Sequence, residues 1–390
     1  MIDFKKHFDE ARDLLRFGDF AVATKRIIDF TLDTEQIAFY HKTNQLLNWL
    51  DTNPATEETR LKLSALLEEL YAVLQSKPYK ERQKILSATN VEKEYSPAAF
   101  ALGPVNLELY EGDIVGLVGE NGNGKTTLLR LLCGELFATS GSITYNFEYE
   151  DLFDLRTKLV YIPQRTDTWR GSMYENLVFT AASYGYASEE NHLVVELTIA
   201  RLGLRKFRNH SWKSLSSGYK MRFELARMLL RKPKVLLIDE PLANLDILAQ
   251  QTVLEDFKSI AKSPFRPIGI ILSSQQLYEV EKTSDQVIFL KQGVQKNLHE
   301  TAVTATGDAP VVAKPKPFVV EFESEWAQSR LSDALSTLGL ESLQFNGGTY
   351  IATFSGDVNQ KTFLQQVIDQ DIPLAYFRNI SNSTRRFFVS

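Results

Sequence analysis

The sequence predicts an α/β domain built on a mostly parallel β-sheet, preceded by an all-helical region and followed by a small α+β domain. Residues 86–300 alternate β-rich and helical segments, as a parallel sheet covered by helices requires. Within them, Val235–Ile238 and Ile268–Leu272 are short, uninterrupted apolar runs, which are typical of strands buried on both faces. The chain of 390 residues also exceeds one average domain. We therefore expect two or three domains around an α/β core.

The first region, residues 1–85, predicts four helices. Phe4, Phe8, Ala11 and Leu15 recur at helical spacing, and a Gly-Asp pair interrupts the pattern before it resumes. Two roles stay open for this region. It is either a small helical bundle packed on the next domain or a docking module for a partner protein.

Two segments follow the α/β domain. Residues 301–317 lack periodicity and are rich in proline and small residues, which predicts a linker. The remaining residues predict a strand, a helix, two strands joined by a turn at Gly347-Gly348, a helix and a strand. This order matches a ferredoxin-like α+β domain. The predicted division of the chain is therefore 1–85, 86–300, 301–317 and 318–390.

Composition limits the class of protein. Hydrophobic residues at 44% and charged residues at 24% are typical of a soluble globular protein. The net charge of −5 argues against nucleic acid as the main partner. Cys133 is the only cysteine, so no internal disulfide can form and we expect a reducing compartment. No window approaches the roughly 18–20 apolar residues of a spanning helix, so we expect no spanning segment and at most a peripheral membrane role.

A phosphate-binding loop organises the α/β domain. After Asp113–Val118, which predicts a buried strand, the chain reads Gly, four residues, Gly, Lys, Thr. The glycines let successive backbone N–H groups point at phosphate oxygens, and the lysine supplies a mobile positive charge. The threonine hydroxyl can bind Mg²⁺, and the following helix directs its positive end at the anion. The sequence therefore predicts a nucleotide-binding site formed by Gly119, Asn121, Gly122, Asn123, Gly124, Lys125, Thr126 and Thr127.

Further motifs follow the loop. Leu215–Tyr219 reads Leu-Ser-Ser-Gly-Tyr before a predicted helix, and Lys234–Pro241 is an apolar strand that ends in two carboxylates. Leu242–Asp246 then forms an aspartate-containing loop. Together with the phosphate loop, these motifs resemble the ATP-binding cassette (ABC) ATPases over residues 86–298, and four further matches are Tyr95, Gln164, Tyr174–Leu177 and Asp285–Leu290. The resemblance implies a P-loop NTPase cassette of the ABC type.

Two adjacent carboxylates at the end of a buried strand indicate a functional role, because unpaired buried charge is costly. The resemblance implies that Glu240 accepts a proton from the attacking water. It also implies that Gln164 and Gln275 are the other catalytic residues. It implies that Thr126, Gln164 and Asp239 hold Mg²⁺.

The remaining assignments concern ATP itself. The resemblance implies that Tyr95 stacks on adenine and that Asp246 lies in the nucleotide site. It also implies that Ser216 and Gly218 reach the γ-phosphate of ATP held by a second cassette. ATP would then lie between two cassettes, of one kind or two, that pair head to tail.

Two positions depart from the family pattern. Gln275 stands where the family usually has a histidine, and an amide cannot carry a positive charge or exchange protons as imidazole does. We therefore expect slow hydrolysis. In the signature, Ser217 and Tyr219 replace Gly and Gln, and the effect of the added Cβ of Ser217 stays open.

The leading functional prediction is the ATPase subunit of an ABC transporter whose spanning subunits are separate chains. It would bind peripherally to the cytoplasmic face of the inner (plasma) membrane. The C-terminal residues, Leu374–Phe377 and Thr384–Phe388, resemble the end of ATPase subunits of two-component exporters. The alternatives are a soluble ABC ATPase acting on a macromolecular assembly and an ATP sensor that hydrolyses little.

Overall fold

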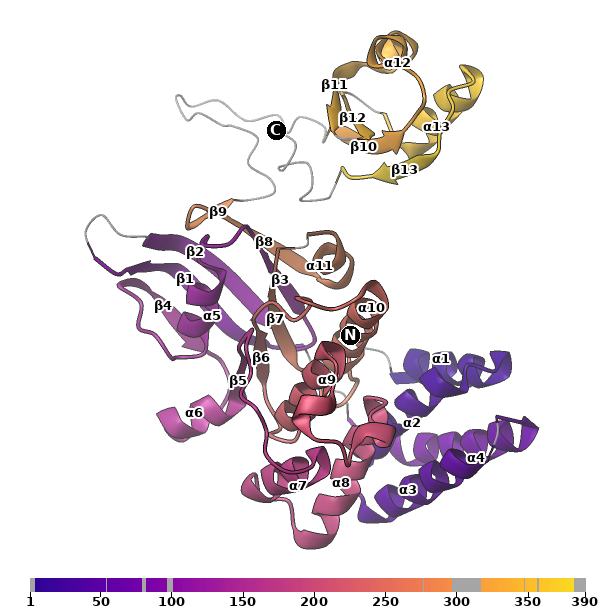
Figure 1. Ribbon diagram of the computed structural model, residues 1–390, viewed down its shortest axis with the longest axis vertical. Helices are drawn as coiled ribbons and strands as arrows, with labels where there is room; N and C mark the ends of the chain where they lie inside the picture. Colours follow the sequence, from indigo (N-terminus) through magenta and orange to yellow (C-terminus); the bar gives the residue numbers. More distant parts are fainter. Residues whose placement is uncertain are drawn as a thin grey trace. The chain divides into compact units, whose positions relative to one another are not determined.

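The computed structural model describes residues 4–53, 55–78, 82–96, 101–275, 277–296, 317–346, 348–355 and 358–381. The chain divides into two compact units, Met1–Lys296 and Asn297–Ser390 (Figure 1). The predicted linker, except for Pro317, lies outside the described residues, as do Gly347 and Thr384–Phe388. Among the helices of the described ranges, none has an apolar stretch long enough to cross a membrane.

The first unit begins with the four predicted helices. They share an apolar core that includes Phe4, Phe8, Leu66 and Leu70, so the helical spacing seen in the sequence corresponds to buried positions. Gly18 separates the first two helices and has a φ of +84°, which favours glycine. The helices are α1 (Phe4–Phe17), α2 (Phe20–Thr34), α3 (Ile37–Thr52) and α4 (Glu57–Leu74).

A six-stranded sheet forms the centre of the cassette. Its strand order is β5-β6-β7-β3-β8-β9, and all neighbours are parallel except the pair β8 and β9. The predicted strand Val235–Ile238 is confirmed, and the run predicted at Ile268–Leu272 forms a strand shifted to Gly269–Ser274. The other strands are β3 (Ile114–Val118), β5 (Leu159–Ile162), β8 (Gln286–Lys291) and β9 (Val294–Lys296), with β6 and β7 as given.

A second, three-stranded antiparallel sheet has the order β2-β1-β4. Alternate residues of the central strands enter two apolar clusters: Ile114 joins one with α7–α10, and Val115 joins the other with α5 and the antiparallel sheet. The strands are β1 (Lys84–Glu94), β2 (Ala101–Tyr110) and β4 (Ser140–Tyr145). The helices are α5 (Lys125–Leu132), α6 (Leu152–Lys158), α7 (Met173–Ser183), α8 (Ser188–Arg201), α9 (Ser217–Leu229), α10 (Ile247–Ala261) and α11 (Leu277–Thr283).

The N-terminal helices pack directly on the cassette. Ile28 of α2 and Tyr40 of α3 join the same apolar cluster as α7–α10, and Phe265 of the cassette joins the core of the helices. One of the two roles left open by the sequence, packing on the next domain, is therefore observed. Docking of a partner stays a prediction.

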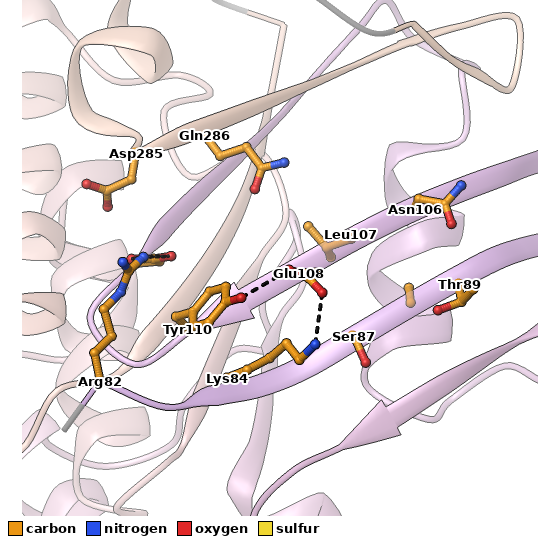
Figure 2. Close-up of a pocket in the computed structure, with 12 residues that line it drawn as sticks. Arg82, Lys84, Ser87, Thr89, Asn106, Leu107, Glu108, Tyr110, Asp285 and Gln286 are labelled. Carbon is orange, nitrogen blue, oxygen red and sulfur yellow. Dashed lines mark hydrogen bonds and ion pairs between the residues drawn. The ribbon is translucent and has the colours of Figure 1, made fainter. Parts of the chain in front are cut away.

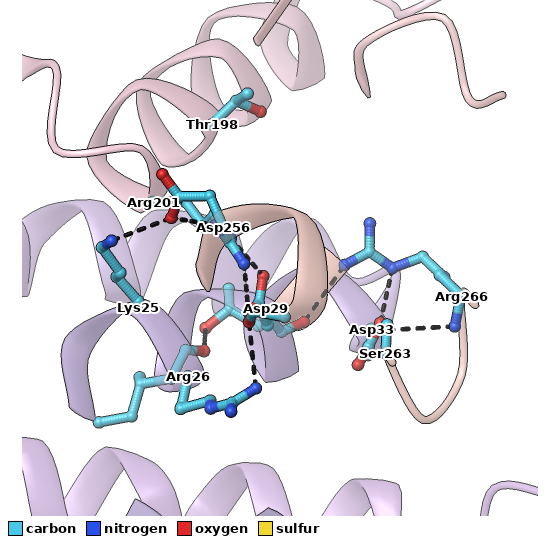
Figure 3. A network of polar contacts seen from close by, with 12 residues as sticks. Lys25, Arg26, Asp29, Asp33, Thr198, Arg201, Asp256, Ser263 and Arg266 are labelled. Carbon is cyan, nitrogen blue, oxygen red and sulfur yellow. Dashed lines mark hydrogen bonds and ion pairs between the residues drawn. The ribbon is translucent and has the colours of Figure 1, made fainter. Parts of the chain in front are cut away.

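A network of buried charges reinforces this contact (Figure 3). Arg201 at the end of α8 is 2% exposed, and its Nε lies 3.0 Å from Asp29 Oδ1 of α2. Its Nη1 donates to Asp256 Oδ1 of α10 at 3.0 Å. Asp256 is also contacted by Lys25 Nζ of α2 at 3.0 Å and by Arg222 Nε of α9 at 3.3 Å. We call Lys25, Asp29, Arg201, Arg222 and Asp256 the helix-interface network.

The second unit contains a four-stranded antiparallel sheet with the order β11-β12-β10-β13 and two helices. This order and the sequence of elements are those of a ferredoxin-like domain, as predicted. The elements are β10 (Phe318–Glu323), α12 (Gln328–Leu335), β11 (Leu340–Asn346), β12 (Thr349–Phe354), α13 (Gln360–Asp369) and β13 (Tyr376–Asn379).

Candidate functional site

The phosphate loop lies between β3 and α5 at the carboxyl end of the parallel sheet. Gly122 and Gly124 have φ angles of +82° and +94°, which L side chains rarely adopt. A Cβ on Gly119 would lie 2.4 Å from the carbonyl oxygen of Leu290 in β8, so only glycine fits there. The side-chain oxygen of Asn123 accepts a hydrogen bond from the backbone N–H of Gln292 at 2.9 Å. The loop is therefore held against the β8–β9 turn.

Lys125 begins α5 and is 5% exposed. Its Nζ donates to the carbonyl oxygens of Gly119 at 2.7 Å and Glu120 at 3.2 Å. The same nitrogen lies 3.1 Å from Glu240 Oε1. The lysine thus folds back over its own loop, where its positive charge faces the second of the two adjacent carboxylates.

Asp239 follows β6 and is 4% exposed. Its carboxylate accepts hydrogen bonds from three hydroxyls: Thr126 at 2.7 Å, Tyr161 at 3.3 Å and Ser273 at 2.6 Å. Burial, together with the neighbouring Asp239, raises the pKa of Tyr161, so this hydroxyl stays a donor at neutral pH. Among the described residues, no lysine or arginine pairs with Asp239. Its negative charge is held by neutral groups alone.

Glu240 has a φ of +50°, a backbone conformation that is uncommon for a residue other than glycine. Its N–H donates to Ser273 Oγ at 2.9 Å, which fixes the peptide in this orientation. Its Oε1 is buried, and in the described structure its polar contact is the ion pair with Lys125 Nζ at 3.1 Å. A strained backbone at a buried, ion-paired carboxylate is typical of a functional site.

Gln275 follows β7, and its Nε2 donates to Asn121 Oδ1 of the loop at 2.9 Å. Gln164 follows β5 and is exposed, and Tyr95 follows β1 and is 54% exposed. No contact of Gln164 or Tyr95 with the phosphate loop is recorded among the described residues. Lys93 Nζ lies 5.5 Å from the centre of the Tyr95 ring.

The signature residues lie at the start of α9. Ser216 is the exposed N-cap of this helix, and Gly218 approaches α10 so closely that a Cβ would lie 3.3 Å from that of Ala249. Asp246 caps α10 by accepting a hydrogen bond from the N–H of Ala249 at 2.9 Å. Tyr219 packs on Phe207, with ring centres 3.9 Å apart, so it fills apolar space. Within the described part of this chain, the three predicted site residues Ser216, Gly218 and Asp246 make no contact with the phosphate loop.

The residues at the loop fit a magnesium ion. Thr126 and Asp239 already share a hydrogen bond and present a hydroxyl and a carboxylate, the hard oxygen ligands that Mg²⁺ prefers. The described residues contain no group of three or more His, Cys, Asp or Glu that could hold a metal ion. A Mg²⁺ site of nucleotide enzymes usually combines one or two carboxylates with phosphate oxygens and water.

The sequence analysis missed two residues of this site, Ser273 and Tyr161. In the parallel sheet Ile238 lies opposite Leu272, so the next residues along each strand, Asp239 and Ser273, also come together. Tyr161 lies opposite Leu237 on the other side. Aligning the ends of the strands by register would have shown that Ser273 lies beside Asp239. The contact of the Tyr161 hydroxyl with Asp239 depends on a side-chain conformation, which the register does not give.

A cavity of about 600 Å³ lies elsewhere, on the antiparallel strands β1 and β2 near the amino ends of β3 and β8 (Figure 2). Four of its charges pair with one another, Arg82 with Asp113 and Lys84 with Glu108 at 2.8 Å, and Asp285 pairs with Lys262 outside the lining at 2.6 Å. The hydroxyl of Tyr110 donates to Glu108 at 3.1 Å. The phosphate loop follows the opposite end of β3, so this cavity is separate from the nucleotide site.

The chain is similar to known ATP-binding proteins of ABC transporters. The family model described as ABC transporter matches residues 102–243. A putative ABC transporter ATP-binding protein of Archaeoglobus fulgidus is 30% identical over 215 residues, which cover 53% of this chain and 87% of that protein. The energy-coupling factor transporter ATP-binding protein EcfA1 of Oenococcus oeni is 30% identical over 216 residues, 54% of this chain and 77% of that protein.

Longer relatives match over part of their length. The lactococcin transport/processing ATP-binding protein LcnC-like of Lactococcus lactis is 28% identical over 311 residues, 75% of this chain but 42% of that protein. Among solved structures, cbiO1 of Clostridium perfringens, part of the ABC transporter complex cbiONQ, has a TM-score of 0.51 and 26% identity, covering 55% of this chain and 87% of that one. The family resemblance seen in the sequence is thus confirmed, and the chain belongs to the ABC transporter family as one of its ATP-binding ATPases.

Proposed function

We propose that the chain hydrolyses ATP between two cassettes that pair head to tail, and that this drives transport through separate membrane subunits. The observation that carries the proposal is the division of the predicted site. Lys125, Thr126, Asp239 and Glu240 form one contact network at the loop, while Ser216 is exposed at the start of α9. A second cassette would supply the missing signature to each loop.

The chemistry follows from the contacts at the loop. ATP phosphates would take the place of the carbonyl oxygens and Glu240 around Lys125 Nζ, which frees the Glu240 carboxylate to accept a proton from water. The water oxygen bonds to the γ-phosphorus, the bond from that phosphorus to the bridging oxygen breaks, and ADP leaves with the electron pair. Thr126, Asp239 and Gln164 would hold Mg²⁺, which neutralises charge on the β- and γ-phosphate oxygens.

Gln275 would act on the γ-phosphate from the end of β7. Its amide donates a hydrogen bond to Asn121 of the loop, which supports a similar hydrogen bond to the phosphate. It cannot supply the positive charge of a protonated histidine. Slow turnover is therefore part of the proposal.

The proposed partners and location of the protein are inferred from its family. ATP-binding proteins of ABC transporters act with membrane subunits, and no described helix of this chain could cross a membrane. We infer that the protein binds peripherally to the cytoplasmic face of the inner (plasma) membrane. Tyr95 would stack on adenine and Asp246 would lie near the shared nucleotide.

The test measures ATP turnover and oligomeric state together for the parent, Glu240→Gln and Gln275→His. We expect slow turnover in the parent, a loss of about 10²-fold or more in Glu240→Gln, and a dimer trapped by ATP in that variant. Gln275→His should turn over faster than the parent. Glu255→Gln is the control, because Glu255 is exposed on α10 away from the loop.

A parent that neither hydrolyses ATP nor dimerises with it would overturn the two-cassette proposal. Purification after mild detergent extraction tests the membrane subunits separately. Recovery of the ATP-trapped dimer without any membrane protein would count against the transport role.

A further inference from the structure

A second cavity, of about 450 Å³, lies beside the edge strand β5, next to the C-terminal end of α5. Its volume is within the range of small-molecule sites. Its lining comes from four parts of the cassette and does not include the phosphate loop. The lining residues are Arg130, Cys133, Glu135, Arg156, Leu159, Tyr161 and Arg231.

The cavity carries excess positive charge. Of its lining residues three are arginines and one is a carboxylate, Glu135, which already pairs with Arg130 at 3.1 Å. Burial raises the pKa of the Cys133 thiol to about 11, so this group adds no negative charge at neutral pH. Two guanidinium groups, those of Arg156 and Arg231, are therefore not neutralised within the lining.

The contacts of these two arginines are weak. Arg156 Nη2 donates to the carbonyl oxygen of Gly134 at 3.3 Å. Arg231 reaches the sulfur of Met228 at 3.6 Å and the carbonyl oxygen of Arg156 at 3.5 Å. Its Nε is buried without a hydrogen-bond partner in the described structure. No carboxylate in the described ranges pairs with either arginine.

The surroundings of Arg231 offer its charge an aromatic ring but no anion. Its guanidinium lies 5.1 Å from the centre of the Tyr184 ring, and the charged residue that affects its pKa is another arginine, Arg227. Burial and then the repulsion from Arg227 lower the pKa of Arg231, with Tyr184 acting in the opposite direction. A partly buried cation without a counter-ion is costly unless an anion binds beside it.

We propose that this cavity is a ligand site for a small multivalent oxyanion, either a phosphate compound or a polycarboxylate. Guanidinium groups bind both through paired N–H donors. The site is distinct from the nucleotide site but shares one wall with it, because Tyr161 lines the cavity and its hydroxyl donates to Asp239. It stands independently of the transport function.

The test uses the full chain with its nucleotide site filled by a non-hydrolysable ATP analogue and Mg²⁺. Calorimetric titrations with inorganic phosphate and with tricarballylate, a tricarboxylate, then report binding outside the loop. We expect saturable binding of one equivalent of at least one anion. Arg156→Gln and Arg231→Gln should each weaken it about ten-fold or more.

The control is Arg16→Gln, because Arg16 is exposed on α1, has no ion pair in the described structure and lies outside the cavity. It should bind like the parent. Binding of phosphate alone identifies a phosphate ligand, and binding of tricarballylate alone identifies a polycarboxylate. Arg156 is exposed, so its variant should fold even if Arg231→Gln does not.

Absence of saturable binding by both anions would overturn the proposal. So would binding that Arg156→Gln leaves unchanged, because the anion would then lie elsewhere.

Discussion

The first unit contains two buried groups of charges that differ in how they are neutralised. At the nucleotide site, Asp239 is held by three hydroxyls, and Glu240 Oε1 pairs with one cation, Lys125, at 3.1 Å. In the helix-interface network, Asp29 and Asp256 both face Arg201 at 3.0 Å.

We expect this difference to separate charges that bind ligands from charges that stabilise the fold. Burial alone would lower the pKa of Arg201, but Asp29 and then Asp256 raise it, so the guanidinium stays charged in the folded protein. Its partners are other parts of the chain and do not leave. The hydroxyls around Asp239 are neutral, so a bound Mg²⁺ could replace one of them as a partner of this carboxylate without leaving another charge unpaired. Substitutions in the two groups should therefore affect different measurements.

Arg201→Met should have the largest effect on stability. It keeps a long apolar side chain but leaves the partly buried Asp29 and the buried Asp256 with fewer cations, which typically costs about 3–5 kcal/mol. Urea unfolding followed by circular dichroism and fluorescence measures the loss. Arg12→Met, which removes an exposed ion pair with Glu68, should remain close to the parent. Equal stability of Arg201→Met and the parent would show that the network does not stabilise the fold.

Ser273→Ala should have an intermediate effect. It removes the buried donor to Asp239 and the acceptor of the partly buried Glu240 N–H, at a cost of about 1–3 kcal/mol. Turnover should fall as well, because both carboxylates lose their support. Ser87→Ala, on β1 and away from the loop, is the matched control. Normal turnover in Ser273→Ala would mean that other contacts position the two carboxylates.

Lys25→Met should have the smallest effect. The Lys25 side chain is 26% exposed, and Asp256 would keep Arg201 and Arg222 after its loss. We expect a decrease of about 0.5–1 kcal/mol in the free energy of unfolding. The same urea experiment measures it. A loss as large as that of Arg201→Met would show that the lysine, rather than the arginine, is the main link between α2 and α10.

The sequence predicted the features that depend on local spacing. The phosphate loop, the strand before Asp239 and the four N-terminal helices are of this kind, since glycine spacing and apolar periodicity are local signals. The ferredoxin-like order of the C-terminal unit was also readable from turns and strand lengths.

Features that depend on long-range pairing could not be read in the same way. The contact of Tyr161 with Asp239 joins residues 78 positions apart, and that of Lys25 with Asp256 joins residues 231 positions apart. Isolated basic and acidic residues on helices are most often solvated. The sequence around Lys25 therefore did not indicate its ion pair with the buried Asp256. The predicted roles of Gln164, Tyr95 and Ser216 depend on ATP and a second cassette, and they stay predictions.

The packing of the helices on the cassette also bears on ancestry. Without the N-terminal helices, Phe265 would lose the aromatic ring of Phe4, whose centre lies 5.1 Å away, and Arg201 would lose Asp29. Arg201 would still have Asp256 of α10 as a partner, so a cassette without such helices has a reason to keep the arginine but not the phenylalanine. An aromatic residue at position 265 is therefore the expected marker, within the cassette itself, of a chain that carries such helices.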